Sequence, residues 1–247
     1  MQRTRSRFYL GMTLVLAAIV FTGFMPTLFG RALFNVPTMP GHLYVHGIVL
    51  AAWFALLVTQ ASLVGRQLAV HRQLGWAAVG FAILIPVAGM ATQLAMPAHI
   101  RSSGADLAPF MELIETVFWL NLVASVQFAG FVTAAICLRK QPESHKRLML
   151  LASIAIIQPA AARLSRWPIF GNTASDLSQP ASTGNDVKFA LGAVVLLIIA
   201  MVVNDLRSRG RLHRVTVIGA VILMGMVLLA PAIATSEWAR AVVWAVS

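Results

Sequence analysis

Charged residues are scarce in this chain, and acidic residues and cysteine are scarcer still. Only 11% of the 247 residues are charged, eight residues are Asp or Glu, and Cys137 is the single cysteine. One cysteine excludes a disulfide or a thiolate metal cluster within one chain. No segment alternates apolar and polar residues with period two, which argues against membrane-spanning strands.

Several catalytic motifs are also missing. No glycine-rich phosphate loop leads into a helix with the required Lys and Ser or Thr, and neither an HExxH nor a GxSxG pattern occurs. The last long apolar segment, 215–235, contains no lysine, which argues against a retinal Schiff base. The residues therefore predict none of these familiar chemistries.

Hydrophobic residues, by contrast, make up 59% of the chain. A helix needs about 20 apolar residues to cross a hydrocarbon core of ~30 Å. We therefore predict an all-α, multi-pass membrane protein that forms a single domain over residues 1–247. Its seven transmembrane helices are predicted at about 8–29, 43–64, 75–96, 109–137, 148–168, 187–204 and 215–235. Kinks are expected at Pro26, Pro86, Pro159 and Pro231, and an outer loop at about 169–186.

The basic residues predict the orientation, because Lys and Arg accumulate in the cytoplasmic loops of membrane proteins. With the N terminus inside, the C terminus lies outside, and 13 of the 19 basic residues face the cytoplasm. They are Arg3, Arg5, Arg7, Arg66, Arg72, Arg139, Lys140, Lys146, Arg147, Arg207, Arg209, Arg211 and Arg214. The net charge of +11 then follows from topology, with anionic lipid head groups and no nucleic acid as the partner.

A histidine followed by a cation stands before an apolar segment three times, at His71-Arg72, His145-Lys146 and His213-Arg214. The spacing predicts three hairpin-like repeats after the first helix. One interpretation is that these residues cap the hairpins and anchor them at the interface. The other is that the three histidines converge on haem, a metal ion or a quinone. The cations beside them, including Arg72 and Arg147, would then favour an anionic ligand such as a haem propionate.

A polar stripe runs through the segment 43–64. His46, Trp53 and Gln60 follow one another at intervals of seven residues and share one helix face. Such a stripe is poorly suited to lipid, so we expect it to face the interior of the bundle. It serves either as a seam that packs helices by hydrogen bonds or as the lining of a functional site.

A second polar group is predicted at the outer face. Glu115 is costly to bury alone, and an ion pair with Arg163 is one explanation for it. The alternative is a transition-metal site with ligands from His42, His46, His99 and Glu115. In an enzyme built on that site, the candidate catalytic residues are Glu112 and Glu115, with Glu112 as a general base acting on a metal-bound water.

Several stretches resemble a group of bacterial integral membrane proteins that are usually labelled only as uncharacterised. They are YVHGIVLAAWFALLVTQASLV (44–64), HRQLGWA (71–77), ESHKRLMLLASI (143–154) and DLRSRGRLH (205–213). The resemblance implies the bacterial inner membrane and points to His46, Trp53, Gln60, His71, His145 and His213. The histidines at helix ends are also loosely similar to those of cytochrome b561-like proteins.

Three functions remain open on these grounds. The first is a redox protein that holds haem b or a transition metal ion with histidines and exchanges electrons with quinone. His71 with His145, and His46 with His99, are the pairs expected to ligate haem. The second is a non-catalytic accessory or assembly subunit of a membrane complex. The third is a metal-dependent enzyme that acts on a lipid-phase substrate at the outer face.

Overall fold

The computed structural model of the chain describes residues 2–34, 36, 39–102, 104, 106, 111–170 and 184–246, and no strand occurs among them. The long helices are α1 (Gln2–Gly23), α2 (Gly41–Leu63), α3 (Leu68–Ser102), α4 (Met111–Cys137), α7 (Gly184–Arg209) and α8 (Arg214–Ala234). The shorter ones are α5 (Pro142–Ala155), α6 (Gln158–Leu164), α9 (Glu237–Val246), the π-helix η1 (Met25–Phe29) and the 3-10 helix η3 (Pro168–Phe170).

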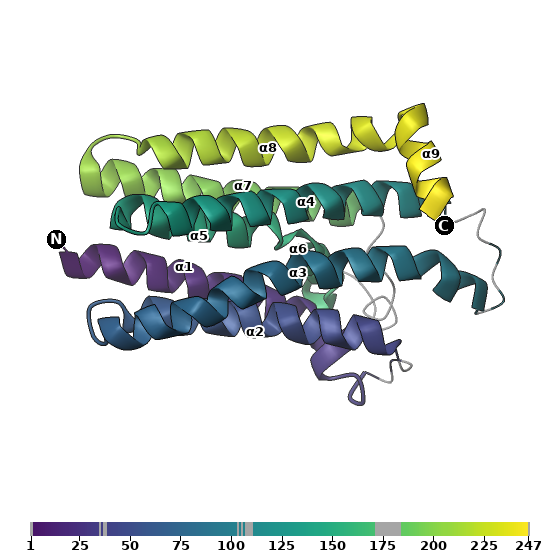
Figure 1. The fold of residues 1–247 in the computed structure, drawn as a ribbon, viewed down its shortest axis with the longest axis horizontal. Helices are drawn as coiled ribbons and strands as arrows, with labels where there is room; N and C mark the ends of the chain where they lie inside the picture. The colour runs from purple at the N-terminus through teal and green to yellow at the C-terminus, as the bar shows by residue number, and fades with distance from the viewer. Residues whose placement is uncertain are drawn as a thin grey trace.

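The long helices lie side by side along one axis, with the two chain termini at opposite ends (Figure 1). Among the described residues, α2, α3, α4, α7 and α8 are long and apolar enough to cross a membrane, and the pair α5–α6 would make a sixth span. Helix α1 has a shorter apolar stretch, Arg7–Gly23. The chain is thus an all-helical, multi-pass membrane protein, while the number seven and the orientation stay predictions.

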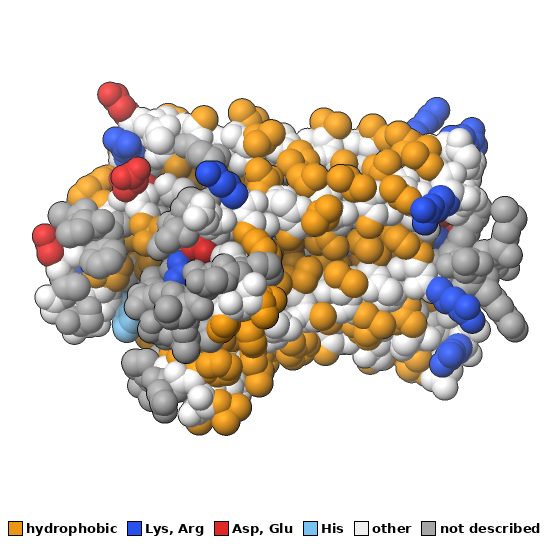
Figure 2. All heavy atoms as spheres, turned by 180° about the vertical axis from the view of Figure 1, so that it is seen from behind, with side chains coloured by type: hydrophobic (Ala, Val, Ile, Leu, Met, Phe, Trp, Pro, Cys, Tyr) orange, Lys and Arg blue, Asp and Glu red, His pale blue; other side chains and the backbone are white. Residues whose placement is uncertain are grey.

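Two names are useful for the ends of the bundle. The N-terminal end holds the start of α1 and the connections 64–67, 138–141 and 210–213, whereas the C-terminal end holds α9 (Figure 1). Between them, Figure 2 shows a wide belt of hydrophobic side chains, with charged side chains gathered toward the ends. Ile83, Leu196, Val221 and Leu228 in the middle of their helices are each more than half exposed. Such exposure is expected where lipid is the solvent.

The interior is built around α4, which contacts α3, α5 and α8. Trp53 from α2 is 1% exposed and packs edge-on against Phe128 of α4, with ring centroids 5.0 Å apart. Its indole Nε1–H donates to the Ser153 hydroxyl of α5 over 3.2 Å. A glycine allows α1 and α6 to approach closely, since a Cβ at Gly23 would overlap the carbonyl group of Ala160.

The segment predicted as one helix at 148–168 is broken in the structure. Helices α5 and α6 meet at an angle of 56° around residues 156–157. Pro159 lies in the first turn of α6, where the missing N–H of proline costs no hydrogen bond. At Pro26 the chain forms the π-helix η1, whereas α3 and α8 run through Pro86 and Pro231 without a break. Most of the loop predicted at 169–186 lies outside the described residues.

Helix α9 is an element that the apolar segments do not predict. Its Ala239 and Val243, one turn apart, are buried against Met111 and Ile114 of α4. The Trp119 indole donates to the Ala239 carbonyl over 3.4 Å. At ten residues, α9 is too short to cross the membrane, so a search for spans misses it.

Candidate ligand-binding site

Arg147 and Asp205 form a buried ion pair at the N-terminal end, and each side chain is 1% exposed. The Arg147 Nε (3.1 Å) and Nη2 atoms donate to Asp205 Oδ1. Asp205 Oδ2 accepts from the His213 backbone N–H (3.1 Å) and from the Thr216 hydroxyl (2.6 Å). Arg147 Nη1 donates to the Glu143 carbonyl and carboxylate, both at 2.7 Å. Every nitrogen of the guanidinium and both oxygens of the carboxylate therefore have partners.

Partly exposed residues surround this pair. Glu143 also accepts from Lys146 Nζ at 2.6 Å and lies 3.5 Å from Arg209 Nη1. Lys146 Nζ lies 4.4 Å from the centroid of the Tyr9 ring. Together these contacts connect α1, α5, α7 and α8 at the N-terminal end of the bundle. We call the residues Arg147, Asp205, Glu143, Thr216 and His213 the Arg147 network.

The Arg147 network gives two of the predicted site residues a structural setting. Arg147, one of the cations predicted to hold an anionic cofactor, has its donors engaged by protein acceptors. The other such cation, Arg72, is exposed. Asp205 was absent from the predicted site, although its position just beyond the apolar segment 187–204 is a signal, because an acid so close to hydrocarbon needs a cation.

His71 and His145 have the same local arrangement in two different hairpins. His71 Nδ1 lies 3.2 Å from the Gln60 carbonyl oxygen, and His145 Nδ1 lies 2.9 Å from that of Ala135. A carbonyl only accepts hydrogen bonds, so Nδ1 must carry the proton in both rings. This leaves each Nε2 with a free lone pair, and the two imidazoles are close enough to act on each other electrostatically.

His213 has the opposite arrangement. Its Nδ1 accepts the Val215 backbone N–H over 3.2 Å and so caps the start of α8. The proton of the neutral ring is then on Nε2, which leaves no lone pair for a metal ion. Burial, together with the positive charges of Arg147 and Arg209, lowers the pKa of His213 and keeps the capping form neutral. The third copy of the histidine pattern therefore differs from the first two.

The stripe predicted on α2 faces the interior of the bundle, as expected. Trp53 is buried, and His46 Nδ1 and Gln60 Oε1 are buried atoms without a hydrogen-bond partner among the described residues. His46 packs against α3, where a Cβ at Gly89 would lie 3.5 Å from its Cε1 atom. The Trp53–Ser153 bond supports the interpretation of this stripe as a seam at its centre. Its outer part, at His46, meets a different environment.

That environment is provided by Arg163, which lies at the end of α6. Its guanidinium lies over the Phe24 ring, 4.6 Å from the centroid, and Nη1 donates to the Pro159 carbonyl over 3.1 Å. Arg163 also acts electrostatically on His46. Its Nε atom is buried without a hydrogen-bond partner, and none of the ion pairs in the described part of the chain includes Arg163.

Trp167 follows Arg163 by four residues in the chain. Its Nε1 atom is buried with no acceptor in the described part of the chain, and its ring packs against Phe34 with centroids 6.4 Å apart. The neighbouring Arg166 is different, because it pairs with Asp186 at 2.6 Å and so uses the nearest carboxylate. We call His46, Arg163 and Trp167 the Arg163 cluster. It is a positively charged site with three buried nitrogens that lack partners within the described residues.

The predicted metal site is not brought together. No group of three or more His, Cys, Asp or Glu side chains is placed to hold one metal ion in the described ranges, which include His42, His46, His99 and Glu115. His99 and Glu112 are exposed. Glu115 is buried and needs a cation, as predicted, but this cation is Arg240 of α9, with Nε 3.4 Å from Oε2, instead of Arg163.

Sequence reasoning named Arg163 only as a possible partner for Glu115 and did not single out Trp167. The sequence did contain a signal for Arg163, because an arginine inside an apolar segment is rare and needs a partner.

A comparison of the chain with protein-family models, with curated proteins and with solved structures finds no match in any of the three.

Proposed function

We propose that this protein binds a quinone at the Arg163 cluster and acts as a redox protein of the bacterial inner membrane, with its N-terminal end toward the cytoplasm. The observation that supports the quinone is the set of buried nitrogens of His46, Arg163 and Trp167 that lack hydrogen-bond partners within the described residues. Arg163 Nε and Trp167 Nε1 are donors, and His46 Nδ1 donates in one of its two tautomers. An oxidised quinone head group has two acceptor oxygens and no donors, so the hydrogen-bonding needs of ligand and site match. Leaving such groups unsatisfied costs about 1–3 kcal/mol each.

The charge of the site favours the same class of ligand. Arg163 is half-buried and forms no ion pair with a carboxylate among the described residues, and such a cation favours a ligand that is negative or becomes negative. A quinone gains negative charge on its oxygens when it is reduced. Arg163 would stabilise that charge, because Asp186, the nearby carboxylate, is already paired with Arg166.

Aromatic rings also line this region. Phe24 lies under the Arg163 guanidinium, and Phe34 packs on Trp167. Flat ligands gain from stacked or edge-on contacts with such rings. These rings favour a quinone over a phosphate head group, which could also accept hydrogen bonds from the same nitrogens.

Haem is a second candidate, supported by the paired arrangement of His71 and His145. Ligating histidines normally donate the proton of the other ring nitrogen to a carbonyl or carboxylate, which fixes the ring. Both rings meet this condition, and His213 does not. A haem held by both Nε2 atoms would supply a one-electron carrier at the N-terminal end, in keeping with the predicted similarity to cytochrome b561-like proteins.

The quinone proposal is tested by titrating detergent-purified, quinone-free protein with decylubiquinone and measuring Kd by calorimetry. We expect Arg163→Met to weaken binding at least tenfold. Trp167→Phe, which removes only the N–H donor and keeps an aromatic ring, should weaken it by about 2–13-fold, the value of one hydrogen bond. Lys188→Met is the control, because Lys188 is an exposed cation at the start of α7.

Two results would overturn the quinone proposal. One is equal affinity in the parent and in both site variants. The other is a parent protein that does not bind decylubiquinone but binds phosphatidate through Arg163, which would make the site one for anionic lipid.

The haem candidate is tested separately by a reduced-minus-oxidised spectrum. We expect Soret and α-band changes that are lost in His71→Gln and His145→Gln and kept in His213→Gln. A featureless parent spectrum would exclude haem from the purified protein.

A further inference from the structure

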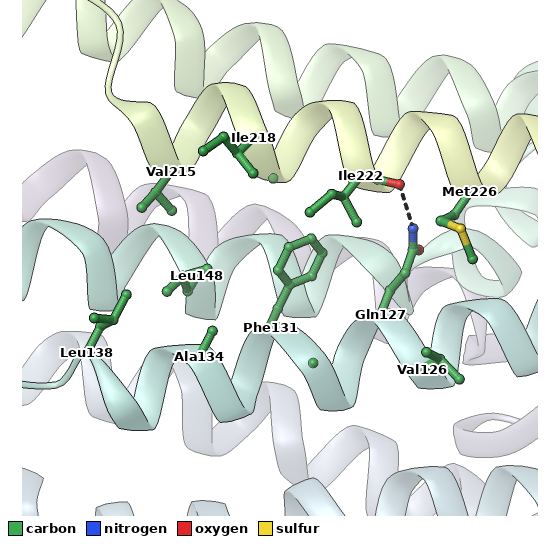
Figure 3. A pocket seen from close by; sticks show the side chains of 12 residues that line it. Val126, Gln127, Phe131, Ala134, Leu138, Leu148, Val215, Ile218, Ile222 and Met226 are labelled. Carbon is green, nitrogen blue, oxygen red and sulfur yellow. Dashed lines mark hydrogen bonds between the residues drawn. The ribbon is translucent and has the colours of Figure 1, made fainter.

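An apolar groove runs along the outside of the bundle between α4 and α8 (Figure 3). Its volume is about 410 Å³, which lies within the range of small-molecule sites. Its walls come from Val126, Gln127, Gly130, Phe131, Ala134 and Leu138 of α4, Leu148 of α5, and Val215, Ile218, Gly219, Ile222 and Met226 of α8.

Two glycines in the walls of the groove have different roles. A Cβ at Gly130 would meet nothing within 4 Å, so this residue leaves the space open. A Cβ at Gly219 would overlap the Leu151 side chain, so this residue lets α8 pack closely on α5. A larger side chain at Gly130 would therefore fill the groove without a clash, whereas one at Gly219 would push the helices apart.

The groove presents almost no polar group to an occupant. Gln127, at its inner end, donates its amide Nε2–H groups to the carbonyls of Ile222 (3.0 Å) and Leu223 (3.2 Å), and Figure 3 shows the first of these bonds. The Gln127 Oε1 atom has no hydrogen-bond partner among the described residues, but it is covered by protein atoms and is not presented to the groove. An occupant must therefore be apolar over this length, as a hydrocarbon chain is.

Length and charge describe the occupant further. Along α4, the walls extend from Val126 to Leu138, which is ~18 Å at 1.5 Å per residue. Half of a ~30 Å hydrocarbon core is about 15 Å, so the groove spans one leaflet. The mouth of the groove lies at the N-terminal end of the bundle. There Leu138 is followed by Arg139 and Lys140, and Val215 is preceded by Arg214, and all three cations are exposed.

We propose that this groove binds one acyl chain of an anionic phospholipid, whose head group lies on Arg139, Lys140 and Arg214. The chain matches the apolar walls and the length of one leaflet, and the phosphate matches the cations at the mouth. A second copy of the protein fits less well. A two-fold axis along the membrane normal would bring the same three cations of each copy together.

The chain-binding part is tested by native mass spectrometry of the detergent-purified protein with palmitoyl-oleoyl phosphatidylglycerol. We expect Gly130→Leu to reduce the retained lipid at least fivefold, because the leucine fills the groove. Leucine is also a better helix former than glycine, so folding should be kept. Gly80→Leu is the matched control, since Gly80 lies in α3 with equally open space at its Cβ position.

The head-group part is tested by comparing phosphatidylglycerol with phosphatidylcholine of the same chains. The triple variant Arg139→Gln, Lys140→Gln and Arg214→Gln should lose the preference for phosphatidylglycerol, while Arg66→Gln with Arg72→Gln, at another hairpin of the same end, should keep it. Equal lipid retention in Gly130→Leu and Gly80→Leu would overturn the proposal. So would a dimer that dissociates in Gly130→Leu, because the groove would then hold a second copy.

Discussion

Two arginines inside the bundle differ in what surrounds them: Arg147 is 1% exposed, whereas Arg163 is half-buried and only its Nε atom is fully covered. At the N-terminal end, the guanidinium nitrogens of Arg147 have acceptors from Asp205 and Glu143. In the last turn of α6, Arg163 has one carbonyl and the face of Phe24, and its Nε has no acceptor among the described residues. Burial of a cation is thus no guide to its role by itself.

The difference is the basis for proposing that Arg147 serves stability and that Arg163 serves binding. A buried charge with a complete set of partners holds helices together, and losing one partner leaves the other unsatisfied. A buried charge that lacks a partner weakens the ligand-free protein and gains when an acceptor arrives. We therefore expect the Arg147 network to act as a structural element, and the Arg163 cluster is the proposed site for a ligand.

The largest expected effect comes from opening the Arg147 network. Asp205→Asn leaves the Arg147 guanidinium facing a neutral amide, and breaking a buried pair in this way costs about 3–5 kcal/mol. Both side chains are 1% exposed, so water cannot compensate. The measurement is the midpoint of thermal unfolding in detergent, with Glu112→Gln, an exposed acid at the other end, as control. A midpoint equal to that of the parent would show that the network is not structural.

A smaller effect is expected from pH, through His213. The pKa of His213 is lowered in the folded protein. Near pH 6.5 its imidazole therefore binds a proton in the unfolded chain but stays neutral in the folded chain. Stability contributed by the neutral ring is therefore present above about pH 6.5 and is lost as the pH falls below it. His213→Asn can still cap α8 but cannot titrate. As the pH is lowered from 8 to 5, the unfolding midpoint should fall less steeply in this variant than in the parent, and parallel curves would refute the assignment.

The ion pair of Glu115 and Arg240 should matter less than that of Arg147, although its carboxylate is buried. Arg240 is 50% exposed and 3.4 Å away, so water screens the pair. We expect Glu115→Gln to lower the free energy of unfolding by no more than about 1 kcal/mol. The comparison with Asp205→Asn in the same assay checks whether exposure of the partner decides the cost. A loss as large as that of Asp205→Asn would contradict it.

The local parts of this structure could be predicted from the sequence. Apolar length predicts the helical, membrane-spanning class, and a seven-residue spacing predicts that Trp53 faces inward. The partners could not be predicted, because they depend on which helices are neighbours. Arg147 and Asp205 are 58 residues apart, and Trp53 and Ser153 are 100 apart.

The same limitation explains why the sequence predicted a metal site that the structure does not bring together among the described residues. His42 and His46 share a helix face by spacing, but whether His99 and Glu115 join them depends on packing between α2, α3 and α4. Helix α9 supplies the cation for Glu115 and is too short for a search by apolar length. The histidine pattern, in turn, could not show that His213 holds its proton on the other nitrogen from His71 and His145.

The smallest effect on stability is expected from Arg163→Met, and its difference from Arg147→Met tests the comparison of the two arginines most directly. Arg147→Met and Arg163→Met are the same substitution at a buried and at a half-buried arginine. The first should cost about 3–5 kcal/mol, because it leaves the Asp205 carboxylate buried and unpaired. The second should leave the quinone-free protein within about 1 kcal/mol of the parent, since methionine keeps the contact with Phe24 and removes an unsatisfied cation. Unfolding midpoints of both variants in one detergent provide the measurement. A large loss in Arg163→Met would mean that this arginine is structural, and the quinone proposal would lose the observation that supports it.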